Sequence, residues 1–234
     1  SAKDYETYLT KFLIEAKQSL KKQIISEKNK SIEQAQNDDA DNSNLYNYRV
    51  KNDDNGNNEL SLYATLLMPF WDKNPSVQSF INQLLKSDDK RLKYTTTLLL
   101  LRNHKPVPDT LLNYFAASDN YRYELYSDLN SSKLSRLFPS AFNTQLALAK
   151  SKLFDISNNY NQPDSVVYLD KLPIQFKDRS GFVYFFKYKG KRDDANWKLA
   201  TVGIVPNDPK KFEFDTKKEK YWEERQYSFT ELTN

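Results

Sequence analysis

Few side chains in this sequence are of the types that catalyse reactions. His104 is the only histidine, and the 234 residues include no cysteine. Catalytic triads and zinc sites draw on those two residue types, and no G-x-S-x-G motif lies near His104. The glycines are too scattered for a phosphate-binding loop or a dinucleotide fingerprint; they are Gly56, Gly181, Gly190 and Gly203. We therefore expect no enzyme, no cofactor and no metal site.

The Asn/Asp-rich stretch 36–58 has the composition of a calcium loop but not its spacing. With Gly56 at the sixth position of an EF-hand loop, Lys51 and Leu62 fall at the first and twelfth positions, where oxygen ligands are required. A loop that starts at Asp39 ends on Val50. Both registers fail, so this stretch is interpreted as a flexible loop.

Paired carboxylates for glycoside hydrolysis form the catalytic alternative that stays open. They need a separation of about 5–10 Å, which only a fold defines. Asp128, Glu223 and Glu224 have no special sequence context.

Aromatic residues, 14% of the chain, are the remaining group with binding chemistry. In the strand-like run 182–188, alternation places Tyr184, Phe186 and Tyr188 on one face. Such a sheet can stack bases or sugars, or hold a peptide. The candidate ligand or partner surface is Tyr168, Tyr184, Tyr188 and Trp197. In the alternative interpretation, one face of the sheet packs on helices and the C-terminal tail partly covers the other.

Charge gives no support for nucleic-acid binding. The formal net charge is +4, and basic residues are scattered or paired with acids. The densest basic cluster, Lys217–Lys220, is interpreted as a solvated surface. No apolar run approaches the roughly 20 residues of a membrane span.

The elements before residue 155 are predicted to be helices. Apolar residues of 76–85 recur at helical spacing, and the run Leu98–Leu101 predicts a helix buried on most sides. Further helices are expected to start at 108, 118 and 140, the last of them placing Phe142 and Leu146 inward. A long helix over 4–35 carries a stripe that includes Tyr8 and Ile24.

From residue 165 the hydrophobic period becomes two, which predicts an antiparallel meander. Val166–Leu169 and Ile174–Phe176 are expected to be strands separated by Pro173, and edge strands are expected at 212–214 and 227–229. A further short strand is expected at 45–50, within the Asn/Asp-rich stretch. The fold class is therefore α+β. We divide the chain into a long amphipathic helix at 1–35, the flexible loop at 36–58, a HEAT-like helical domain at 59–154 and a β meander at 155–234. A compact irregular bundle is the alternative to HEAT-like stacking, because no fixed repeat period is found.

Three phrases carry a resemblance to known proteins: Leu62–Leu67 before Pro69-Phe70-Trp71, Leu98–Asn103 before Pro106–Asp109, and Tyr184–Tyr188 before Trp197-Lys198-Leu199. Together they resemble the C-terminal accessory region of large Gram-negative envelope-associated proteins that carry a TraB/GumN-type domain. The resemblance implies a cell-envelope or periplasmic location. The TraB/GumN catalytic signature is not present, so no active-site residue is carried over.

These observations favour a non-catalytic interaction or scaffolding module. No signal peptide is apparent, and we expect the chain to be a fragment of a larger protein. Its expected partner is another protein or a neighbouring domain of the parent chain. A glycan- or peptide-binding module that uses the aromatic sheet is the alternative.

Overall fold

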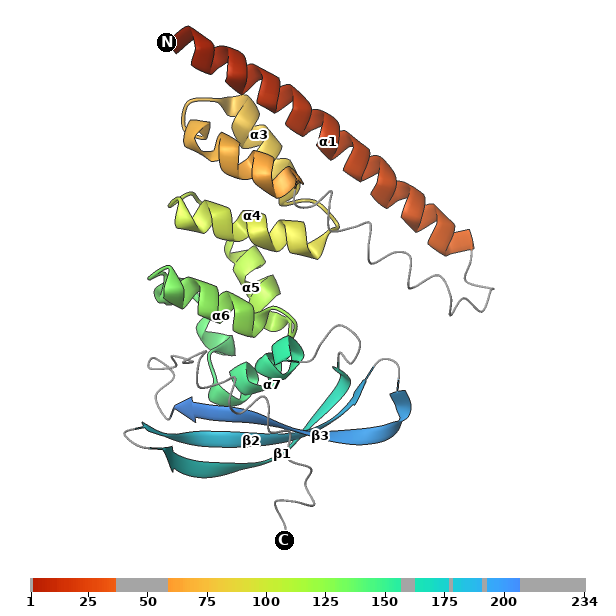
Figure 1. Cartoon of the computed structure of the whole chain (residues 1–234), viewed down its shortest axis with the longest axis vertical. Coiled ribbons are helices and arrows are strands. Elements are labelled where there is room, and N and C mark those ends of the chain that lie inside the picture. The colour runs from red at the N-terminus through yellow and green to blue at the C-terminus, as the bar shows by residue number, and fades with distance from the viewer. Residues whose placement is uncertain (1, 37–58, 157–162, 177–178, 191–192, 207–234) are drawn as a thin grey trace. The chain divides into compact units, whose positions relative to one another are not determined.

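The computed structural model describes residues 2–36, 59–156, 163–176, 179–190 and 193–206 (Figure 1). These residues form seven α-helices, followed by a three-stranded antiparallel sheet. The α+β prediction is therefore confirmed. The strands expected at 45–50, 212–214 and 227–229 lie outside the described residues, as does most of the 36–58 loop.

The chain separates into two compact units, Ser1–Val107 and Pro108–Asn234, and each is described by itself. The division falls inside the 59–154 segment, which the sequence pattern treats as one helical domain. Helices on both sides of Val107 carry similar apolar stripes, so hydrophobic spacing does not separate the two units.

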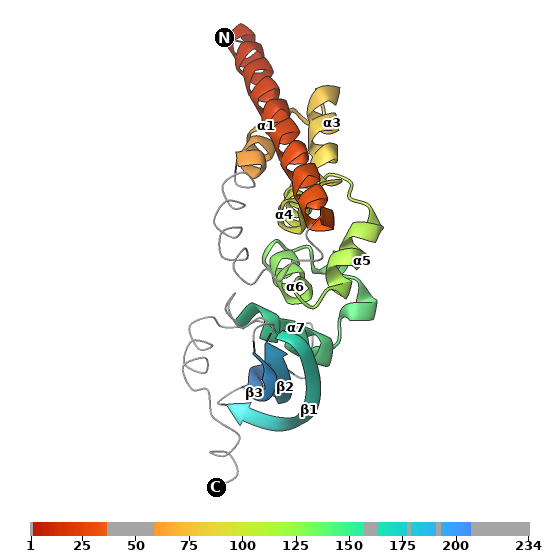
Figure 2. The same ribbon diagram turned by 90° about the vertical axis from the view of Figure 1, so that its right-hand side faces the viewer.

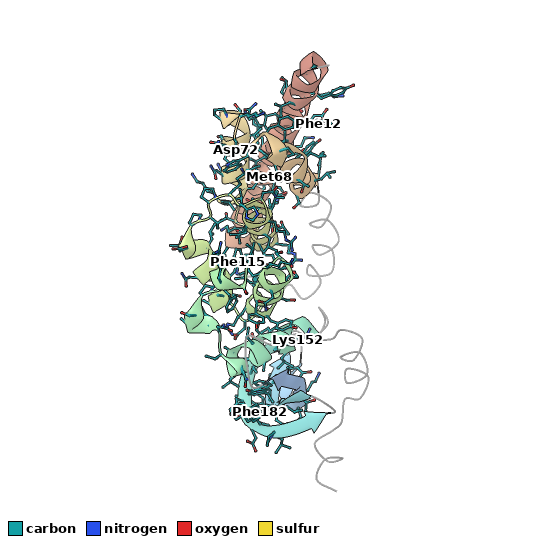
Figure 3. All side chains as sticks on the ribbon, turned by 90° about the vertical axis from the view of Figure 1, so that its left-hand side faces the viewer. Phe12, Met68, Asp72, Phe115, Lys152 and Phe182 are labelled. Carbon is teal, nitrogen blue, oxygen red and sulfur yellow. The ribbon has the colours of Figure 1, made fainter. Side chains whose placement is uncertain are left out.

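Unit 1 is built around α1 (Ala2–Gln36), a helix of 35 residues. Ala16 and Leu20 of α1 are buried in a core formed with the helix at 59–67, η1 (Met68–Phe70), α3 (Pro75–Leu84) and α4 (Lys90–Arg102). Figure 3 labels Met68 of this core and Phe12, which packs against the core from α1. The helix therefore packs on the other helices of its own unit.

The prediction of the α1 stripe is wrong for two of its residues. Tyr8 is 62% exposed, and Ile24 is also exposed. Leu13, Ala16 and Leu20 lie toward the core at spacings of three and four, and Tyr8 and Ile24 fall beside this seam. Toward its end the seam becomes polar, where the Ser87 hydroxyl donates to Glu27 Oε1 at 3.0 Å.

Side chains that cap the backbone set the starts of α3 and α4. Asn74 Oδ1 accepts from the N–H of Ser76 at 2.9 Å, and Pro75 occupies the first turn. Asp89 Oδ1 accepts from the N–H of Leu92 at 2.8 Å. Asparagine and aspartate are both favoured at the N-cap position. The apolar face of α3 is fully buried, namely Val77, Phe80, Ile81 and Leu84.

Two helices end on residues in the left-handed region. His104 has φ 55°, and the N–H groups of His104 and Lys105 bond to the carbonyls of Leu101 and Leu100. Lys133 has φ 59° and ends α6 (Arg122–Ser131) in the same way. This is the Schellman arrangement, in which glycine is the usual residue. The only histidine thus terminates a helix.

Unit 2 begins with α5 (Asp109–Ala117) and α6, continues through η2 (Ser135–Leu137) and η3 (Ser140–Phe142), and reaches α7 (Gln145–Ile156). The prediction of one helix over 140–154 is wrong at its start. Thr144 Oγ1 accepts from the N–H of Ala147 at 3.2 Å, which caps α7 there. Phe142 consequently lies in η3, and Leu146 is exposed rather than inward.

The sheet has the order β1 (Pro163–Phe176), β2 (Arg179–Gly190) and β3 (Asp193–Pro206). The predicted meander is confirmed, but Pro173 does not split β1. It pairs with Phe182 inside one continuous strand, because an edge strand tolerates a residue without an N–H. Register shifts mark β1 at Asp164 and Leu169, and β1 curves visibly in Figure 2.

Helix α7 covers one face of the sheet and contacts all three strands. The residues buried on this face include Tyr184, Phe186 and Val202. We call the face under α7 the inner face of the sheet, and the opposite face the outer face.

Candidate functional site

The four aromatic residues expected to share a surface lie on two faces of the sheet. Tyr184 and Tyr188 alternate along β2 on the inner face, and Tyr168 joins them because it pairs directly with Phe186. Trp197 precedes Lys198, which pairs with Tyr188, so its own side chain points to the outer face. The four rings therefore do not form one stacking platform.

The inner-face rings pack on one another and on α7. Tyr184 is 2% exposed and stacks on Phe186, with ring centroids 6.5 Å apart. The Tyr168 ring, 39% exposed, lies 6.4 Å from Tyr184 at the rim. Burial, followed by the nearby Tyr168, raises the pKa of the Tyr184 phenol above its usual value. A phenol in this environment is part of the core and is not accessible to a ligand.

The outer face carries exposed apolar side chains from both edge strands. Trp197 and Leu199 of β3 are each 44% exposed. Val167 and Leu172 of β1 are also exposed, and their pairing with Lys187 and Val183 of β2 assigns them to this face. Large apolar side chains gathered on one exposed face are a feature of interaction surfaces.

Two lysines of β2 concentrate positive charge beside Trp197. The Nζ atoms of Lys187 and Lys189 lie 4.8 and 5.4 Å from the centroid of the indole ring. Both distances are within the range of cation–π attraction. The ammonium groups are thereby held above β3, although their backbone belongs to the central strand.

Sequence reasoning found Trp197 but missed Lys187, Lys189 and Leu199 as parts of the same surface. Alternation along β2 does place the two lysines on the face opposite to Tyr184. Alternation therefore shows that the two lysines share a face. It does not show which face of the sheet a helix covers.

A second polar cluster, around Arg122, is structural. Arg122 is 7% exposed, and its guanidinium donates to the carbonyls of Ala116, Ala117 and Ala147 at 2.7 to 3.1 Å. Asp119 pairs with Arg122 and, at 2.8 Å, with Lys150 of α7. The cluster joins the end of α5 to α6 and α7, and so holds in place the helix that covers the sheet.

The described residues do not test the carboxylate alternative. Glu223 and Glu224 lie outside them, and Asp128 is in α6. Within the described ranges no group of three or more His, Asp or Glu side chains is placed to hold a metal ion. No helix in the described part of the chain is long and apolar enough to cross a membrane.

Comparisons of the chain with protein-family models, curated proteins and solved structures find no match. The comparisons therefore point to no function, and the outer face is a candidate surface because an indole, two ammonium groups and several exposed aliphatic side chains meet there.

Proposed function

We propose that the chain is a non-catalytic interaction or scaffolding module, and that the outer face of the sheet binds its protein partner. The observation that carries the proposal is the contrast between the two faces. The inner face is packed under α7, whereas the outer face leaves Trp197 and Leu199 nearly half exposed. Tryptophan is enriched among the residues that contribute most to protein–protein binding energy.

The helices of unit 2 support the scaffolding role. Helix α5 packs on α6, and α6 packs on α7, so each element mainly contacts the next one along the chain. That succession is the packing mode of HEAT-like repeats, which present extended surfaces to partners. We extend the proposal accordingly: the helical part is HEAT-like, and the module belongs to a larger envelope-associated protein.

Site-specific photo-crosslinking in cells of the source organism tests the outer face. Benzoylphenylalanine replaces Leu199 on the outer face in one variant and Tyr114 of α5 in a matched control. The two positions have equal exposure, 44% each. A discrete adduct is expected from position 199 and not from position 114, and mass spectrometry then identifies the partner or the neighbouring domain of the parent chain. Equal adducts from both positions, or none from position 199, would contradict the proposal.

A further inference from the structure

The two edges of the sheet differ in how well they resist pairing with another strand. In β1, the edge is interrupted by register shifts at Asp164 and Leu169 and by Pro163 and Pro173. Bulges and prolines are the usual protection of an exposed edge. These features protect the free edge of β1 against a partner strand.

The edge of β3 lacks that protection over its central part. Register shifts also interrupt β3, between Asp193 and Lys198 and between Val202 and Val205, but its pairing with β2 is regular from Lys198 through Val202, and proline enters β3 only at its last residue. Among the described residues, β3 pairs with β2 alone. Alternate N–H and C=O groups of such an edge strand point away from the sheet, ready to form a ladder with an incoming strand.

The charges next to this edge select the kind of strand that fits. Lys187 and Lys189 hold their ammonium groups above Trp197 of β3. Asp170 also belongs to the outer face, but it lies on the far strand and accepts from the N–H of Lys171 at 2.7 Å. A strand added to β3 runs about 4.8 Å from it, so carboxylates on that strand are within reach of both lysines.

Apolar contacts complete the match. Leu199 and Trp197 are neighbours at alternate positions of the same strand, and both are half exposed on the outer face. Cross-strand pairs with aliphatic or aromatic residues of an added strand would cover them.

We propose that an extended acidic segment of the partner protein adds to β3 as a fourth strand, with its carboxylates on Lys187 and Lys189. The inference rests on the proposed function, since it states how the outer face recognises its partner. Main-chain hydrogen bonds to β3 provide the affinity, and the lysines with Trp197 provide the preference for acidic sequences.

The test uses the full chain and a fluorescein-labelled peptide of alternating valine and glutamate. Saturable binding is expected by fluorescence anisotropy, with amide hydrogen-exchange protection appearing within residues 197–202. The matched peptide of alternating valine and lysine should not bind. The acidic peptide with all of its amides N-methylated keeps its charge but has no N–H donor on either edge, so its binding should be lost.

Charge reversal tests the contribution of the two lysines to binding separately from that of the β3 backbone. The double variant Lys187→Glu and Lys189→Glu should bind the acidic peptide about tenfold more weakly, because two favourable ion pairs become repulsive. Lys86→Glu with Lys90→Glu, in unit 1, is the control and should leave binding unchanged. Equal binding by the N-methylated peptide, or by the double lysine variant, overturns the proposal even if the crosslink from position 199 is obtained.

Two other occupants of the β3 edge would also overturn the proposal. If residues 207–234 of the same chain cover β3, the amides within 197–202 will be protected before any peptide is added, at every protein concentration. If a second copy covers β3, their protection will rise with protein concentration.

Discussion

The phenol of Tyr184, on β2, donates a hydrogen bond of 3.0 Å to Oε1 of Gln145, in the first turn of α7. This contact joins the centre of the sheet to the helix that covers it. It also explains why an aromatic residue in the most strand-like segment of the chain is not available to a ligand.

Removing that hydrogen bond should weaken unit 2 without changing its fold. Tyr184→Phe keeps the ring and its stacking on Phe186 but removes the donor to Gln145, so the free energy of unfolding should fall by about 1 kcal/mol. Denaturant titration measures the change. Tyr188→Phe, four residues along the same face, is the matched control and should change stability by less. An equal loss in both variants would mean that the Gln145 contact contributes nothing specific.

The raised pKa of Tyr184 predicts a loss of stability in alkali. Burial holds the folded-state pKa above the usual value of 10.0, so the folded protein keeps a proton that the unfolded chain releases. The stabilisation is complete below about pH 10 and is lost as the pH rises through the folded-state pKa. Denaturation measured across this range should show a shallower decline for Tyr184→Phe than for the unaltered chain. Parallel declines would contradict the assignment.

Removal of the Arg122 side chain should destabilise unit 2 strongly. Arg122→Ala leaves the carbonyls of Ala116, Ala117 and Ala147 without this donor, and we expect a loss of about 2–4 kcal/mol. Arg122→Lys should recover only part of that stability, because an ammonium group lacks the planar fork. Thermal unfolding followed by circular dichroism measures both variants. Arg136→Ala, at an exposed position, is the control and should stay within about 0.5 kcal/mol of the unaltered chain.

Glycine at the two left-handed helix ends should stabilise the protein. Lys133→Gly and His104→Gly each relieve the strain of a side chain at positive φ, and a gain of about 0.5–1 kcal/mol is expected for each. Ser127→Gly, in the exposed interior of α6, should instead cost about 0.5 kcal/mol. Chemical denaturation distinguishes the two signs. If Lys133→Gly destabilised α6 as Ser127→Gly does, the strain argument would fail.

Hydrophobic spacing by itself determined the helices, the strands and part of their faces. The burial of α3 on Val77, Phe80, Ile81 and Leu84 and the shared face of Tyr184 and Phe186 follow from periods of 3.6 and 2. These are local consequences of backbone geometry, and they need no knowledge of distant residues.

Only the tertiary structure decided which surfaces are covered. The shift at Leu169 reverses the alternation in β1, so Lys171 rather than Asp170 pairs with Tyr184, and counting along the sequence cannot reveal it. The side of the sheet that α7 covers depends on contacts such as that of Tyr184 with Gln145, between residues far apart in the chain. Period-two alternation marks two faces but does not say which will be buried. Because α7 covers the face of Tyr184, the side chains of Trp197, Lys187 and Lys189 lie on the uncovered outer face.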